Sequence, residues 1–132
     1  MSDSPKLGYV ILYVQDVLET IAFYETAFDL PRGFVHESKQ YAQMKTGTTA
    51  LAFADETTCP VAGAFRQARG DEESPAFEVA LVVSDVEQAY KRAIAAGAPA
   101  VASPSLKPWG QTVAYVKDLN GVLVELCTSM GD

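Results

Sequence analysis

Two glutamates stand in segments that otherwise have the sequence of buried strands. Glu125 lies within the apolar run 122–126, and Glu78 lies directly before the apolar run 79–83. An ionised carboxylate enters an apolar sheet only when it is paired, protonated or bound to a cation. Such a group can move a proton, ligate a metal or hold a cationic ligand. Two structural roles stay open: backbone amides or an arginine can satisfy Glu125, and Glu78 can be exposed at the end of its strand.

Aromatic side chains are a second group able to bind a ligand. Trp109 lies in a Pro-Trp-Gly sequence, where an indole can stack on a planar ligand or cover a cation. A hydrophobic plug between structural units explains this residue equally well, because tryptophan is normally buried. Further aromatic side chains that could line a ligand-binding pocket are Tyr9, Tyr13, Phe53 and Tyr115.

Covalent and phosphate chemistry has little support in the sequence. No serine stands in a Gly-x-Ser-x-Gly motif, and neither a phosphate-binding loop nor a dinucleotide fingerprint is present. His36 is the only histidine, and it is predicted on a different strand from both glutamates. Cys59 and Cys127 lack CxxC spacing and are expected to be free thiols.

The bulk composition is that of one acidic globular domain. The chain has 132 residues, of which 48% are hydrophobic and 20% are charged, and a net charge of −7. This charge argues against nucleic acid and anionic membranes as partners. No apolar run approaches the roughly 20 residues needed to span a bilayer, and the N-terminal sequence lacks the features of a signal peptide. A cytoplasmic location is therefore expected.

Periodicity and capping signals predict the same order of elements twice. In the first half, a strand at 7–14 precedes a helix that begins after Asp16 and ends near Asp29. In the second half, a strand at 76–83 precedes a helix that begins after Asp85 and ends at Gly97. Short strands follow at 33–38, 41–46 and 49–54, and again at 100–102, 111–117 and 121–128. The segment between the halves has the composition of a linker and can accommodate a short helix near 64–69.

The amino-acid sequence itself also repeats between the two halves. Leu-Tyr-Val-Gln-Asp-Val at 12–17 matches Leu-Val-Val-Ser-Asp-Val at 81–86 with an offset of 69. Two copies predict an α+β fold made of two βαβββ modules related by a pseudo-twofold axis. We expect a single domain over 1–132, with module 1 at about 7–55, a linker at about 56–75 and module 2 at about 76–128.

Several short motifs, in a fixed order over nearly the whole chain, resemble those of the vicinal oxygen chelate superfamily. They are Val14-x-Asp16, Phe23-Tyr24, Pro108-Trp109-Gly110-Gln111 and Asp118-x-x-Gly121-x-x-x-Glu125. This superfamily includes glyoxalase I, extradiol dioxygenases, and the fosfomycin-resistance and bleomycin-resistance proteins. The resemblance implies paired βαβββ modules whose strands curl as a mixed sheet around a shared cavity, commonly in a homodimer.

The resemblance also implies four positions for metal ligands, which fall here on Tyr9, Ala52, Glu78 and Glu125. Alanine cannot ligate, and a tyrosine phenolate is costly at neutral pH because the phenol pKa is roughly 10. Only the two glutamates remain as weak metal candidates, so no tightly held zinc or nickel is expected. A weak site for a hard divalent cation stays open.

Strand alternation separates these positions from the predicted core. On each of these strands, one side carries mainly aliphatic residues that are expected to pack under the helices. The other side carries Tyr9, Tyr13, Ala52, Glu78 and Glu125. We therefore hypothesise that Glu78 and Glu125 open into one cavity lined also by Tyr9 and Ala52. The small side chains at 50, 52 and 54 would leave room there for a ligand.

These observations predict a homodimeric small-molecule-binding protein that takes a cationic or aromatic ligand without a tightly held metal. The expected ligand-binding residues are Tyr9, Tyr13, Ala52, Phe53, Glu78, Trp109, Tyr115 and Glu125. The alternative is a metal-dependent enzyme, resembling a lactoylglutathione lyase or a dioxygenase, with Glu125 as the candidate catalytic residue. A third reading, a module without any ligand, predicts a collapsed cavity filled by Tyr9 and Trp109.

Overall fold

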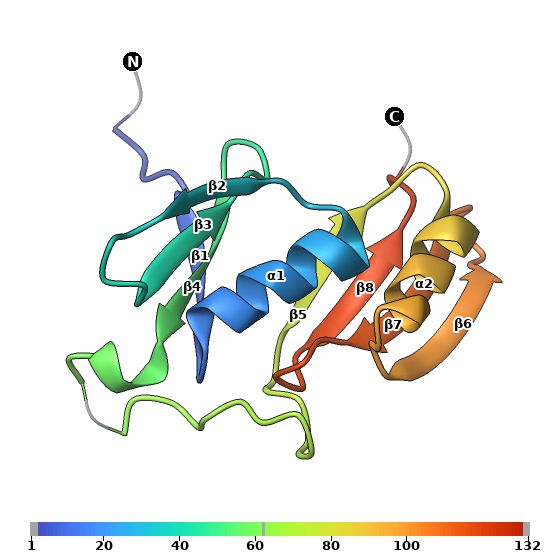
Figure 1. Cartoon of the computed structure of the whole chain (residues 1–132). Coiled ribbons are helices and arrows are strands. Elements are labelled where there is room, and N and C mark those ends of the chain that lie inside the picture. Colours follow the sequence, from blue (N-terminus) through green and yellow to red (C-terminus); the bar gives the residue numbers. More distant parts are fainter. Residues whose placement is uncertain (1–2, 62, 131–132) are drawn as a thin grey trace.

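The computed structural model describes residues 3–61 and 63–130 and contains two βαβββ modules (Figure 1). Residues 1, 2, 62, 131 and 132, which the predicted domain includes, lie outside the described residues. The elements of module 1 are β1 (Tyr9–Val14), α1 (Val17–Phe28), β2 (Arg32–Val35), β3 (Tyr41–Met44) and β4 (Ala50–Asp55). Those of module 2 are β5 (Glu78–Val82), α2 (Val86–Ala95), β6 (Ala100–Leu106), β7 (Thr112–Lys117) and β8 (Leu123–Cys127).

Each module has its own four-stranded mixed sheet. The strand orders are β1-β4-β3-β2 and β5-β8-β7-β6, in which the first pair is parallel and the others are antiparallel. The predicted α+β class and the duplicated βαβββ order are confirmed. The two sheets are separate, and α1 lies between them and contributes to the cores of both modules (Figure 1).

The local capping signals operate as the sequence predicts. The Asp16 side chain accepts a hydrogen bond from the Glu19 backbone N–H (2.9 Å) at the start of α1. Asp29 ends that helix in the left-handed region at φ 57°. In module 2 the Asp85 side chain accepts a hydrogen bond from the Gln88 N–H (3.1 Å).

The segment between the modules differs from the prediction. No helix forms near 64–69; instead a short 3₁₀ helix, η1 (Glu56–Thr58), follows β4, and Asp55 caps it. Phe65 lies stacked on Tyr13 of β1, with ring centroids 4.6 Å apart and planes 10° apart. This contact holds the segment against module 1, where residues 63–69 form turns and irregular chain.

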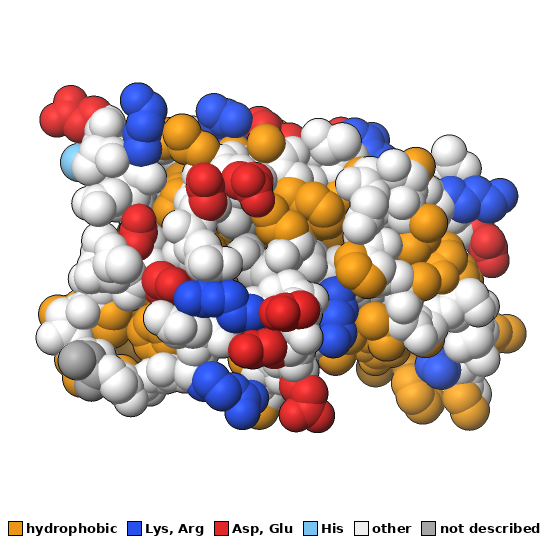
Figure 2. All heavy atoms as spheres, turned by 60° about the horizontal axis from the view of Figure 1, so that its bottom comes forward, with side chains coloured by type: hydrophobic (Ala, Val, Ile, Leu, Met, Phe, Trp, Pro, Cys, Tyr) orange, Lys and Arg blue, Asp and Glu red, His pale blue; other side chains and the backbone are white. Residues whose placement is uncertain are grey.

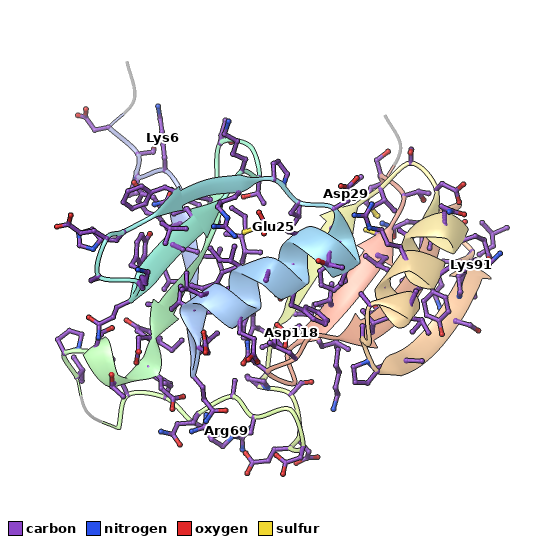
Figure 3. All side chains as sticks on the ribbon, viewed as in Figure 1. Lys6, Glu25, Asp29, Arg69, Lys91 and Asp118 are labelled. Atoms are coloured by element: carbon purple, nitrogen blue, oxygen red, sulfur yellow. The ribbon has the colours of Figure 1, made fainter. Side chains whose placement is uncertain are left out.

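A buried polar cluster joins α1 to the β7–β8 turn (Figure 3). The Tyr24 hydroxyl donates to Asp118 Oδ2 (2.6 Å), and the backbone N–H groups of Asn120 and Val122 donate to Asp118 Oδ1. The Asn120 amide in turn donates to the Thr20 hydroxyl (3.1 Å). The Asp118-x-x-Gly121 motif therefore has a structural role, because it ties module 2 to the helix of module 1.

The same turn also anchors the connecting segment. Gly121 has φ 81°, and a Cβ at this position would collide with the Arg69 carbonyl oxygen. Ser74 donates a hydrogen bond to the Gly121 carbonyl (2.6 Å), and Arg69 forms an ion pair with Glu56 (2.9 Å).

The face that carries this segment shows acidic and basic side chains intermingled across its middle, with hydrophobic side chains at the surface on either side (Figure 2). Among the described residues, no helix is both long and apolar enough to cross a membrane.

Candidate functional site

The face of each sheet that points away from its helix carries the residues singled out from the sequence. We call these the open faces. The open face of module 2 consists of Glu78, Ala80 and Val82 of β5, Leu123, Glu125 and Cys127 of β8, and Val113, Tyr115 and Lys117 of β7. The opposite sides of β7 and β8 pack with α2 in the core.

Glu78 and Glu125 meet on the open face of module 2. Ala80 lies opposite Glu125 in the parallel β5–β8 pair. Glu78, two residues before Ala80, is therefore a diagonal neighbour of Glu125 on the same side of the sheet. A hydrogen bond between the two carboxyl groups, partial burial and the negative charge of Glu125 raise the pKa of Glu78 to about 7. The pair therefore holds a shared proton at mildly acidic pH and loses it as the pH rises past neutrality.

The groups next to this pair are donors without positive charge. The Tyr115 hydroxyl donates a hydrogen bond to Glu125 Oε1 (3.2 Å), and burial together with the two carboxylates raises the pKa of Tyr115. Burial and the hydrogen bond with Glu125 raise the pKa of the Cys127 thiol to about 11, so this thiol is protonated and unreactive at neutral pH. The arginine expected under a purely structural role for Glu125 is not among its partners in the described residues.

Trp109 lies at the far end of the same module, in the loop between β6 and β7. Its side chain is 62% exposed, so it is not the hydrophobic plug that the sequence left open. The indole N–H donates to the Gln111 side-chain oxygen (2.9 Å). Gln111 was not singled out from the sequence, although the alternation of β7 already places it on the same side as Tyr115.

The open face of module 1 carries Tyr9 and Tyr13 but only part of the predicted wall. Tyr9 is 59% exposed, whereas Phe65 covers Tyr13. Ala52 is fully buried between Ile11 and Gln43, its neighbours across β1 and β3, whereas Ala50 is half-buried and lines the groove between the modules.

Phe53 is a correction to the predicted site. Its side chain is fully buried on the helix side of β4, where it packs against Tyr24 with ring centroids 4.8 Å apart. Strand alternation puts Phe53 on the opposite side from Ala52, so it cannot line an open face.

Within one chain, the two open faces do not form a single cavity. A groove of about 1110 Å³ runs between the modules, lined mainly by helix-side residues such as Val10, Leu51 and Leu81. Glu78 reaches the edge of this groove, whereas Tyr9, Ala52 and Glu125 do not line it. The chain thus brings Glu78 and Glu125 together and leaves Tyr9 and Ala52 on the other module.

The chain is similar to known proteins over most of its length. It matches the family model of the Glyoxalase/Bleomycin resistance protein/Dioxygenase superfamily over residues 6–126. The chain belongs to this superfamily. A relative is the uncharacterized protein YraH of Bacillus subtilis, which is 25% identical over 123 residues, or 92% of this chain and 96% of YraH.

Solved structures share the fold of this chain over nearly its whole length. A glyoxalase-related enzyme from Fulvimarina pelagi aligns with a TM-score of 0.79 at 18% identity, covering 96% of this chain and 89% of that one. TioX from a Micromonospora species aligns with a TM-score of 0.73 at 24% identity, covering 94% of this chain and 98% of that one. These similarities establish the fold and leave the ligand open.

The metal chemistry that superfamily membership raises does not fit the donors of one chain. The described residues contain no cluster of three or more His, Cys, Asp or Glu side chains able to hold a metal. Glu78 and Glu125 supply two carboxylates, and the neutral Tyr115 is a poor ligand. His36 does not belong to this group of donors. Its ring forms hydrogen bonds with Ser38 on an exposed turn of module 1.

Proposed function

We propose that the open face of module 2 binds a small molecule that carries a positive charge next to an apolar or aromatic body. The carboxylate pair formed by Glu78 and Glu125 carries this proposal, because the two groups lie together on an accessible face. A cationic group bound between them relieves their mutual repulsion.

The lack of a cationic partner for the pair among the described residues supports this role. Within residues 3–61 and 63–130, none of the ion pairs uses Glu78 or Glu125. Lys117 shares the open face and forms no ion pair with either glutamate. Two unneutralised carboxylates destabilise a fold, so their pairing here suggests a binding role.

Apolar side chains around the pair favour a ligand with a hydrophobic body. Val82 is 66% exposed beside Ala80, and Trp109 supplies an exposed aromatic surface at the far end of the face. Singly charged amines attached to aromatic groups match this combination of charge and apolar surface.

A homodimer is part of the proposal. Both open faces expose large apolar side chains, including Tyr9 and Ile11 on module 1 and Val82 on module 2. Large apolar side chains exposed together on one face are typical of an interface. If two chains pair through these faces, the exposed Tyr9 of one would close the site of the other, which would bring it beside Glu78 and Glu125 as the sequence predicts.

We further propose a cytoplasmic location, which accords with two free thiols, Cys59 and Cys127. The alternative function remains a metal-dependent lyase-like or dioxygenase-like enzyme, with Glu125 as its catalytic residue. The meeting of Glu78 and Glu125 favours it to the extent that both can ligate one cation, with further donors from a second chain.

Calorimetric titration with an arylalkylammonium ion tests the proposal. The matched uncharged alcohol is the control ligand, and Glu87→Gln on the exposed side of α2 is the control variant. We expect the ammonium ion to bind the wild type and to lose tenfold or more in affinity in Glu125→Gln, which corresponds to about 1.4 kcal/mol. Equal binding of the alcohol, or unchanged binding in Glu125→Gln, contradicts the proposal.

Titration with Mn²⁺ in the absence of chelators separates the alternative. Micromolar metal binding by the wild type that disappears in Glu125→Gln would favour the enzyme. Weak, millimolar binding is expected if two carboxylates are the only protein ligands.

A further inference from the structure

The Trp109 loop combines an exposed indole ring with a hydrogen-bonded support. The loop closes on itself, because the Lys107 N–H donates to the Gln111 carbonyl (2.8 Å) and the Gly110 N–H donates to the Lys107 carbonyl (2.9 Å). Gly110 has φ 95°, a conformation that favours glycine. These hydrogen bonds therefore fix the backbone conformation of the loop at Trp109.

The side chain of Gln111 forms a hydrogen bond with the indole of Trp109. This side chain is buried, and its Oε1 atom accepts the indole N–H while its amide nitrogen donates to the Thr128 carbonyl (2.9 Å). An indole only donates and a carbonyl only accepts, so these two partners determine which way the amide faces. The amide also contacts the Cys127 thiol, which follows Glu125 on the same side of β8.

An exposed tryptophan gains little stability from such a support. Its ring is not packed in the core, and water can satisfy the indole N–H as well as Gln111 does. Loss of side-chain rotation costs about 0.5–1.5 kcal/mol when a flexible group is immobilised on binding, and a ring already fixed avoids that cost. The support is therefore better explained by ligand binding than by folding.

We propose that Gln111 is a positioning residue that fixes the Trp109 indole as a preformed aromatic platform for the far end of the ligand. This inference rests on the proposed function, because it places the cationic end of the same ligand at Glu78 and Glu125.

The spacing along β7 defines the class of ligand. Tyr115 lies opposite Glu125, and Gln111 is four residues earlier on the same side of the chain. At roughly 3.3 Å per residue, the platform lies roughly 13 Å from the carboxylates along the strand. The site thus recognises an elongated molecule with an ammonium group at one end and a planar aromatic group at the other.

The first test needs no ligand. Trp109 is the only tryptophan, so the protein has a single indole N–H signal in an NMR spectrum. We expect this proton to exchange slowly with water in the wild type and at least tenfold faster in Gln111→Leu. Backbone amide signals that stay at their wild-type positions in Gln111→Leu, apart from those next to residue 111, separate a lost hydrogen bond from a general loss of structure.

The second test compares two ammonium ligands. In one, the aromatic ring is adjacent to the charge; in the other, a rigid spacer of roughly 10–15 Å separates them. Only the long ligand should lose affinity in Gln111→Leu, by about two- to tenfold, and in Trp109→Leu the further change Gln111→Leu should have no effect. Gln40→Leu, an exposed glutamine in the β2–β3 loop, is the matched control.

The outcomes distinguish this inference from the function on which it rests. An indole proton that remains equally protected in Gln111→Leu, or a long ligand that binds Trp109→Leu as it binds the wild type, overturns the positioning role. Failure of both ammonium ligands to bind the wild type contradicts the proposed function, while the NMR comparison still decides whether Gln111 holds the ring.

Discussion

Replacing Glu78 with glutamine should stabilise the protein at high pH. The folded chain holds a proton on Glu78 with a pKa of about 7, whereas the ordinary value is 4.5, because Glu125 lies beside it. The folded state therefore binds this proton more tightly than the unfolded state does. The stability contributed by this proton is fully present below pH 4.5 and is lost as the pH rises through 7. Glutamine cannot ionise, so the variant avoids that loss.

The size of the effect follows from the exposure of the pair. A shift of this size on a fully buried group would correspond to about 3 kcal/mol, since each factor of ten in proton affinity is worth 1.36 kcal/mol. Glu78 is exposed and water screens its repulsion by Glu125, so we expect about 1 kcal/mol. Such a cost is typical of groups that are retained for binding at the expense of stability.

Urea unfolding at several pH values between 4.5 and 8.5 provides the measurement. The difference in unfolding free energy between Glu78→Gln and the wild type should grow from pH 5 to pH 7 and stay constant above pH 8. Glu87→Gln, an exposed glutamate of α2, should show no such growth. A difference that does not change with pH would refute the shared-proton geometry, and with it the main support for a cation-binding face.

Three further predictions concern the junction of the modules and the metal. Asp118→Ala should lower the unfolding free energy by about 4–6 kcal/mol, because it leaves the buried Tyr24 hydroxyl and two backbone N–H groups without an acceptor; Tyr24→Phe, by comparison, should cost about 1–3 kcal/mol. Gly121→Ala should cost more than about 2 kcal/mol by urea unfolding, because the residue has φ 81° and a Cβ would meet the Arg69 carbonyl. Mn²⁺ at micromolar concentration should leave the melting temperature unchanged, and a rise that Glu125→Gln abolishes would contradict the metal-free site.

Local signals in the sequence were sufficient for most of the fold. Asp16 and Asp85 mark the helix starts because a short side-chain acceptor satisfies backbone N–H groups that the helix cannot pair. Period-two alternation placed Glu125 away from the core, and the repeated order of elements predicted two modules. These features depend on residues that are neighbours along the chain.

The connecting segment shows where local signals fail. Its composition allowed a helix near 64–69, but Phe65 packs on Tyr13 and Arg69 pairs with Glu56, and these contacts stabilise an irregular, non-helical path. Tyr13 lies in β1, and Glu56 lies 13 residues before Arg69 at the start of the segment, so the sequence of 64–69 contains neither partner. Tertiary contacts override a weak helix propensity in this way.

What the sequence alone determined is which side of each strand every side chain occupies, because alternation is a property of the backbone. Phe53 is the exception among the predicted ligand-binding residues. Alternation along β4 puts it on the side opposite Ala52, and its side chain is buried there. The tertiary structure alone decided which of these sides come together. Pairing of β5 with β8 puts Glu78 beside Glu125, while Ala52 is enclosed by its neighbours on β1 and β3. Distances between strands depend on long-range pairing, which no local pattern encodes.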